Sequence, residues 1–144
     1  MKQFKEFCEQ AGSVFKGEHF NKQDAWGYQL ILDMEDCSEM MDNKGYVTKF
    51  FKELISELDM KELSPIMIVK VDGPDLGSGR GLSAVQMITT SSITFHSDDD
   101  KRCIYLDVFS CKKYNPDIVI RTVDKYFSPK RISKKFLYRD AEGL

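Results

Sequence analysis

Side chains able to move protons or attack carbonyl groups gather in one segment of the chain, residues 81–111. It reads GLSAVQMITTSSITFHSDDDKRCIYLDVFSC and contains Ser83, Ser91, His96 and Cys111. A serine in a tight turn can attack a backbone carbonyl, a histidine can transfer a proton near neutral pH, and a thiol can donate one. These residue types at this spacing could attack a carbonyl group and move the protons that such a reaction needs.

Each of these residues also has an ordinary structural interpretation when it is taken alone. Serine and threonine clusters are common in hairpin turns, so the turn alone could explain Ser91. A single histidine such as His96 is more often partly buried and hydrogen-bonded than catalytic. An isolated cysteine such as Cys111 often behaves as a small buried hydrophobic residue, and Ser83 alone indicates nothing. Only the combination points to chemistry.

The bulk composition predicts one soluble globular domain. The chain has 144 residues, 42% hydrophobic and 31% charged, which is enough to bury a core without disulfides. A net charge of −2 gives no reason to expect nucleic-acid binding, and we interpret the Lys/Arg-rich segment 125–139 as a solvated face. No apolar run approaches the ~20 residues of a membrane span, so no membrane partner is expected.

The cysteines and the N-terminus predict a reduced, cytoplasmic protein without a metal site. No apolar core of a signal peptide follows the first residues. The four cysteines lack CxxC spacing, and with only two histidines they give no metal-ligand pattern. They are Cys8, Cys37, Cys103 and Cys111. The glycine-rich segment 72–81 lacks the Lys-Ser/Thr pair of a phosphate-binding loop and leads into no helix.

Hydrophobic periodicity predicts the element order strand–helix–strand–strand–strand–strand–helix–strand, after an N-terminal extension of residues 1–25. The extension contains a possible amphipathic helix between Phe4 and Phe15. Helix starts are expected at Asp42 or Asn43 and at Asn115-Pro116, where the side chains suit the first turn. The expected strands cover residues 28–34, 66–69, 82–88, 92–95, 103–109 and 132–138.

This order predicts an α+β fold, in which an antiparallel sheet carries helices on one face. Residues 26–144 would form this domain as a two-layer sandwich. The other face of the sheet would be apolar and uncovered, and such faces are rarely left open. We therefore expect a homodimer in which two sheets face each other in a four-layer αββα arrangement.

Three stretches carry a resemblance to a known family, the small prokaryotic S-adenosylmethionine decarboxylases. Residues 81–85 (GLSAV) resemble their Gly-Val-Ser-Gly-Val strand, and residues 91–96 (SSITFH) resemble their Ser-His-Leu-Thr-Ile-His. Residues 106–111 (LDVFSC) resemble their Asp-Leu-Phe-Thr-Cys. The resemblance extends over residues 26–138 without large gaps.

The resemblance implies self-cleavage between Thr90 and Ser91. The Ser91 hydroxyl would attack the carbonyl of Thr90, and elimination and hydrolysis would leave a pyruvoyl group at the new N-terminus. The products would be a β chain of residues 1–90 and an α chain of residues 91–144. In the family, the counterparts of Ser83 and His96 handle protons in this step.

The resemblance also implies the reaction and its place in polyamine and spermidine biosynthesis. The pyruvoyl group forms a Schiff base with an amino-acid-type substrate and serves as an electron sink for decarboxylation, much as pyridoxal phosphate does. Cys111 would donate a proton to the resulting carbanion. Active sites of the family lie near the dimer interface.

Two departures from the family pattern bear on processing and on the substrate. The residue before the cleaved serine is Thr90 instead of glutamate. The aromatic residues that stack on adenine are missing from the loop at 72–80 and from the position after His96. Since stacking contributes about 0.5–1.5 kcal/mol per aromatic pair, their loss would weaken adenosine binding. The replacement is acidic, and Asp98 and Asp100 are candidate ligands for a cationic substrate, unless they only form a solvated hairpin turn.

Several functions therefore remain open from the sequence. The first is a self-processed decarboxylase acting on S-adenosylmethionine, or on L-ornithine or L-arginine because the stacking aromatics are missing. The second is an unprocessed, catalytically silent paralogue that binds a partner or ligand, which the replacement of glutamate by Thr90 favours. The third is a generic α+β binding domain whose motif matches are accidental.

Overall fold

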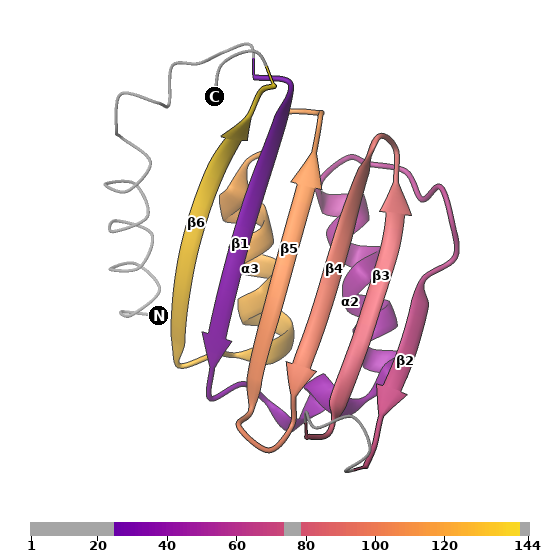
Figure 1. Cartoon of the computed structure of the whole chain (residues 1–144), viewed down its shortest axis with the longest axis vertical. Coiled ribbons are helices and arrows are strands. Elements are labelled where there is room, and N and C mark those ends of the chain that lie inside the picture. Colours follow the sequence, from indigo (N-terminus) through magenta and orange to yellow (C-terminus); the bar gives the residue numbers. More distant parts are fainter. Residues whose placement is uncertain (1–24, 74–78, 142–144) are drawn as a thin grey trace.

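The computed structural model describes residues 25–73 and 79–141. Six strands form one antiparallel sheet in the order β2-β3-β4-β5-β1-β6, and two α-helices lie behind it (Figure 1). The predicted α+β class and the predicted element order are confirmed. The bounds are β1 Gly27–Glu35, η2 (a 3-10 helix) Glu39–Asp42, α2 Lys44–Glu57, β2 Met67–Val71, β3 Gly81–Ile88, β4 Ser91–Asp98, β5 Cys103–Ser110, α3 Pro116–Phe127 and β6 Arg131–Arg139. The expected helix between Phe4 and Phe15, and Cys8 within it, lie outside the described residues.

Side-chain caps fix where both α-helices begin. The Asn43 side chain accepts a hydrogen bond from the backbone N–H of Tyr46 at 2.9 Å and so starts α2. Asn115 does the same for Asp117 at 2.9 Å, and Pro116 fits the first turn of α3, where no N–H partner is needed. The capping signals in the sequence therefore located both helix starts.

The strands run further than the hydrophobic pattern suggested. Ser97 and Asp98 lie beyond the strand expected at 92–95, but they pair with Ile104 and Cys103 and belong to β4. Ser91 likewise begins β4 and pairs with Ser110. Ladder hydrogen bonds continue past the last apolar side chain, so the period-two pattern alone places the strand ends too early.

The core lies between the sheet and the two helices. Alternate side chains of every strand point toward the helices, and a cluster of aromatic rings fills the centre. The ring centroids of Phe50 and Phe127 lie 4.9 Å apart, and Phe95 of β4 lies 5.6 Å from Phe127. Because Phe95 points inward, its strand neighbours Thr94 and His96 point to the other side of the sheet.

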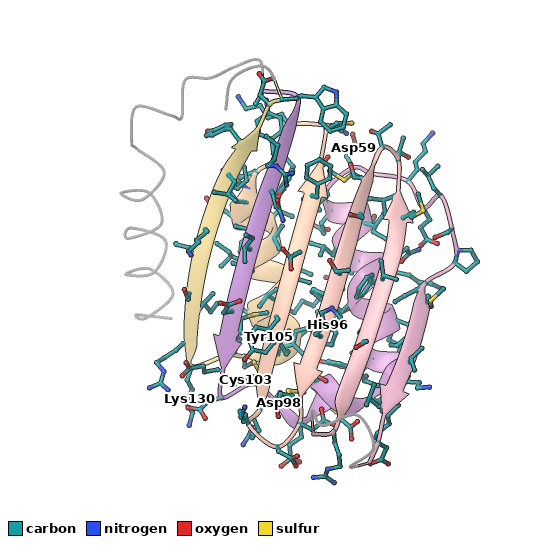
Figure 2. All side chains as sticks on the ribbon, viewed as in Figure 1. Asp59, His96, Asp98, Cys103, Tyr105 and Lys130 are labelled. Carbon is teal, nitrogen blue, oxygen red and sulfur yellow. The ribbon has the colours of Figure 1, made fainter. Side chains whose placement is uncertain are left out.

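The sheet face opposite α2 and α3, the open face, is not covered by any other described element (Figure 1). Tyr105 and His96 lie on this face (Figure 2). Several large hydrophobic side chains are exposed on it: Met67, Val69, Val85, Met87, Tyr105 and Leu137. Among the described residues, no helix is long and apolar enough to cross a membrane.

Candidate active site

The turn between β3 and β4 consists of only two residues, Thr89 and Thr90. Thr90 has a φ of +55°, in the left-handed region. A β-branched side chain is strongly disfavoured there, because Cβ lies too close to the following carbonyl oxygen, which costs about 1–2 kcal/mol. The peptide bond that the sequence predicts to be cleaved therefore follows a strained residue.

The Ser91 hydroxyl is held beside this turn. Its Oγ lies 2.9 Å from Oγ of Ser110, which is fully buried, and 3.3 Å from the carbonyl oxygen of Thr89. Ser110 Oγ in turn accepts a hydrogen bond from the backbone N–H of Lys112 at 3.0 Å. Ser110 pairs directly with Ser91 in the β4–β5 ladder, and its contact with the predicted nucleophile was missed in the sequence because it depends on that register.

Cys111 is the described cysteine that contacts the turn. Its Sγ lies 2.6 Å from Oγ1 of Thr90, directly after the end of β5. Cys103 begins the same strand, about 26 Å away by strand rise. Cys37 is fully buried, and this burial, with a smaller effect of neighbouring Cys103, raises its pKa to about 12. The structure therefore places the Cys111 thiol against Thr90, the residue before the predicted cleavage site.

Ser83 and His96 form a second group. They are direct partners in the β3–β4 ladder, and Ser83 Oγ lies 2.9 Å from His96 Nδ1. Which atom donates depends on the ring nitrogen that carries the proton. The His96 ring is exposed on the open face, where it can reach a bound molecule or another chain.

The two groups do not meet within one chain. Ser91 and His96 are five residues apart on β4, about 16 Å by strand rise. An odd separation also places their side chains on opposite faces of the sheet. In Figure 2, His96 and Asp98 lie toward the end of β4 that is remote from the turn before Ser91. The Ser83–His96 pair of one chain therefore cannot contact Ser91 of the same chain.

The acidic residues lie at that remote end, about 23 Å from Ser91 by strand rise. Asp98 accepts the backbone N–H of Lys101 at 3.1 Å, and its carboxylate lies 3.4 Å from Lys101 Nζ. Asp100 pairs with Arg80 at 2.8 Å, which holds the pKa of this carboxyl below its ordinary value. Their contacts are those of a hairpin turn with local ion pairs. No group of three or more potential metal ligands occurs in the part of the chain that the structure describes.

Comparison with known proteins identifies the family. The family model for S-adenosylmethionine decarboxylase matches residues 28–140, most of the chain. The chain belongs to the S-adenosylmethionine decarboxylase family. The resemblance drawn from the sequence is confirmed, and with it the class of pyruvoyl-dependent decarboxylases, whose pyruvoyl group derives from a serine of a proenzyme.

Individual relatives are distant but cover most of the family domain. The chain is 24% identical over 115 residues to an S-adenosylmethionine decarboxylase proenzyme of Clostridium botulinum strain Hall, which spans 78% of this chain and 93% of that protein. It is 27% identical over 88 residues to the proenzyme of strain Langeland, or 60% of this chain and 70% of that protein. The crystal structure of the adenosylmethionine decarboxylase from Aquifex aeolicus VF5 has the same fold, with a TM-score of 0.68, 16% identity, and coverage of 81% of this chain and 92% of that one.

Proposed function

We propose that this member of the S-adenosylmethionine decarboxylase family cleaves itself between Thr90 and Ser91 and then decarboxylates S-adenosylmethionine for polyamine biosynthesis. The observation that carries this proposal is the turn itself. A strained Thr90 precedes Ser91, whose hydroxyl lies beside the turn, and Cys111 contacts the same residue.

The self-cleavage uses groups that the turn already places together. Ser91 Oγ attacks the carbonyl carbon of Thr90, the C–N bond breaks, and the hydroxyl proton passes to the freed amine. The ester that forms is then eliminated with loss of the Ser91 α-proton, which leaves Thr90 with a carboxylate. Hydrolysis of the remaining dehydroalanine releases ammonia and leaves the pyruvoyl group. Breaking the bond also frees Thr90 from its left-handed conformation, which favours the forward reaction.

The fit of the chain to the pyruvoyl group rests on the same geometry. Once formed, the group supplies an electron sink for loss of carbon dioxide. Cleavage makes residue 91 a chain end, so it is no longer fixed by the hairpin and can turn toward the open face. Cys111, which contacts Thr90, is then the nearest described thiol and donates a proton to the product carbon.

The proposed active unit is a homodimer in which two open faces meet. Exposed apolar side chains on that face support it, and so does the separation of Ser91 from the Ser83–His96 pair. The two-fold axis would lie between the two facing sheets, perpendicular to the strands and over the middle of β4. Rotation about this axis would bring His96 of the partner subunit to Ser91. Each active site would then use the turn of one chain and the Ser83–His96 pair of the other.

An intact mass spectrum followed by a decarboxylation assay tests the proposal. Wild-type protein should separate on denaturation into fragments of residues 1–90 and 91–144, and the processed protein should release carbon dioxide from S-adenosylmethionine. Ser91→Ala should remain one species of 16.6 kDa and be inactive. Wild-type protein that stays full length after prolonged incubation would instead support the unprocessed paralogue.

Ornithine and arginine are the second candidate substrates and belong in the same assay. The observation that favours them is the loss of aromatics from the two family positions that stack on adenine. The acidic turn adds little, since Asp98 and Asp100 are already engaged by Lys101 and Arg80. Release of carbon dioxide from either amino acid but not from S-adenosylmethionine would overturn the preferred substrate and keep the reaction class.

A further inference from the structure

Trp26 lies exposed at the end of the sheet where the predicted cleavage turn is found. Trp26 is the only tryptophan of the chain, and it is 66% exposed although tryptophan side chains are usually mostly buried. The indole stacks on the ring of Phe109, with centroids 6.1 Å apart and planes inclined by 28°. One aromatic face is thus supported from below, while most of the indole remains available for contact.

Phe109 is held firmly enough to support the indole. Gly27, the first residue of β1, follows Trp26. A Cβ at Gly27 would lie only 2.8 Å from the Phe109 ring, so the ring packs directly against the glycine backbone. The Arg139 guanidinium lies 5.6 Å from the centroid of Phe109 and donates a hydrogen bond to Gln29 at 2.6 Å. We call Trp26 and Phe109 together the aromatic platform.

The platform adjoins the proposed reaction centre. Phe109 is the ladder partner of Ser92, the residue after Ser91. Phe109 also precedes Cys111 by two residues, about 7 Å of strand rise. The start of β1, the end of β5 and the start of β4 all lie at the same end of the sheet (Figure 1). A planar group stacked on Trp26 therefore lies next to the place where the pyruvoyl group and the thiol would act.

We propose that the aromatic platform binds the adenine ring of the substrate by stacking on Trp26, which makes Trp26 a specificity-determining residue of this chain. The inference rests on the proposed function, and it supplies the adenine-stacking aromatic residue that this function requires. The two family positions that stack on adenine hold no aromatic residue here, whereas the platform offers a flat, exposed ring. Every nucleobase has a flat π-face that can stack on an aromatic side chain, so adenine can stack on Trp26 without hydrogen bonds to the base.

Kinetics of the processed enzyme form the first test. Trp26→Ala should raise KM for S-adenosylmethionine about 5- to 150-fold, the factor expected for loss of one stacked base, with a smaller effect on kcat. Trp26→Phe should keep most of the affinity, and self-cleavage should proceed at the wild-type rate in both variants. Met40→Ala is the matched control, because Met40 is also an exposed large hydrophobic residue but lies in η2, outside the sheet and its open face. An unchanged KM in Trp26→Ala would overturn the inference.

Tryptophan fluorescence gives a second test that does not depend on turnover. Since Trp26 is the only tryptophan, 5′-methylthioadenosine added to the processed protein should quench its emission saturably, whereas ornithine should not. Absence of saturable quenching would overturn the inference. An emission change that follows dimer dissociation on dilution, and not the added nucleoside, would show that Trp26 is an interface contact. If the wild type instead releases no carbon dioxide from S-adenosylmethionine but still binds the nucleoside, the proposed substrate fails and the platform stands.

Discussion

Thr90 combines two properties that rarely occur together in a stable turn. It is β-branched, and its backbone lies in the left-handed region immediately before Ser91. Glycine or asparagine would adopt this conformation at lower cost. The chain thus keeps strain at the bond that we propose is broken, which is where such strain can assist a reaction.

Relief of this strain should make the precursor more stable and slower to react. In a Ser91→Ala background, Thr90→Gly should raise the free energy of unfolding by up to about 1 kcal/mol, since glycine removes the Cβ clash but gains freedom in the unfolded chain. In the Ser91 background the same change should slow self-cleavage. Urea unfolding and time-resolved gels measure the two effects. Ser128→Gly, at another left-handed position distant in the fold, should stabilise without changing the cleavage rate.

Ser110 should act by positioning the Ser91 hydroxyl. Ser110→Ala removes the 2.9 Å contact, and loss of a hydrogen bond worth about 1 kcal/mol should slow cleavage several-fold. Ser110→Thr keeps a hydroxyl and should restore most of the rate. Comparison of cleavage rates with thermal midpoints separates positioning from simple destabilisation. Equal slowing in both variants would show that the volume of this buried side chain matters instead of its hydroxyl.

Cys111 should be the thiol required for turnover. Cys111→Ala should still cleave itself but lose decarboxylation or protonate the product at the wrong carbon. Iodoacetamide at pH 8 should modify Cys111 and stop turnover, whereas Cys37 should stay unmodified because burial raises its pKa to about 12 and excludes the reagent. Peptide mass mapping identifies the labelled residue. Full activity of Cys111→Ala would leave the proton donor unassigned.

At the scale of elements, the order along the chain was predictable and the neighbours across the sheet were not. The capping residues Asn43 and Asn115 predicted where both helices begin, and alternating apolar residues predicted the strands. The placement of β1 between β5 and β6 depends on non-local pairing, which leaves no local pattern in the sequence. Consequently the meeting of Ser83 with His96, and the distance of both from Ser91, became apparent only from the register.

The contact between the two helices has a pH dependence of its own. The Glu53 carboxylate of α2 accepts hydrogen bonds from Lys125 and Tyr126 of α3, and these donors hold the pKa of Glu53 below its ordinary value. The stabilisation is therefore present above the ordinary glutamate pKa of about 4.3 and is lost as pH falls through the lowered folded value. Since Glu53 is partly exposed, Glu53→Gln should lower the free energy of unfolding by less than about 1 kcal/mol at pH 7.

Denaturant unfolding of the wild type and Glu53→Gln at a series of pH values checks this. The difference in the free energy of unfolding between the two proteins should shrink toward zero as the wild-type Glu53 carboxylate becomes protonated. A difference that is constant from pH 7 to pH 3 would mean that the ion pair and hydrogen bond add nothing beyond packing.

At the scale of the whole molecule, the open face and the divided site both call for a second copy. If the two-fold axis crosses the middle of β4, Thr94 of each chain lies close to that axis on the open face. Facing sheets pack about 10 Å apart, so a thiol cross-linker of that length should join two Thr94→Cys chains. Arg131→Cys is the control, because Arg131 is also on the open face but lies four residues along β6 from the level of Thr94, about 13 Å from the axis by strand rise. Sedimentation of a stable monomer at micromolar concentration would exclude this assembly.

The sheet order gives the processed protein an unusual connectivity. Cleavage at Thr90–Ser91 assigns β1, β2, β3 and α2 to the first fragment and β4, β5, β6 and α3 to the second. Yet β1 is hydrogen-bonded between β5 and β6, both of which belong to the other fragment. The precursor folds as one covalent chain, so forming these ladders requires only closure of its own loops. After cleavage the same ladders hold together two separate polypeptides, and renewed folding from the denatured state would be a reaction between molecules, slower on dilution. Maturation thus converts a chain whose strands all pair within one molecule into two fragments whose ladders can form again only when the fragments associate.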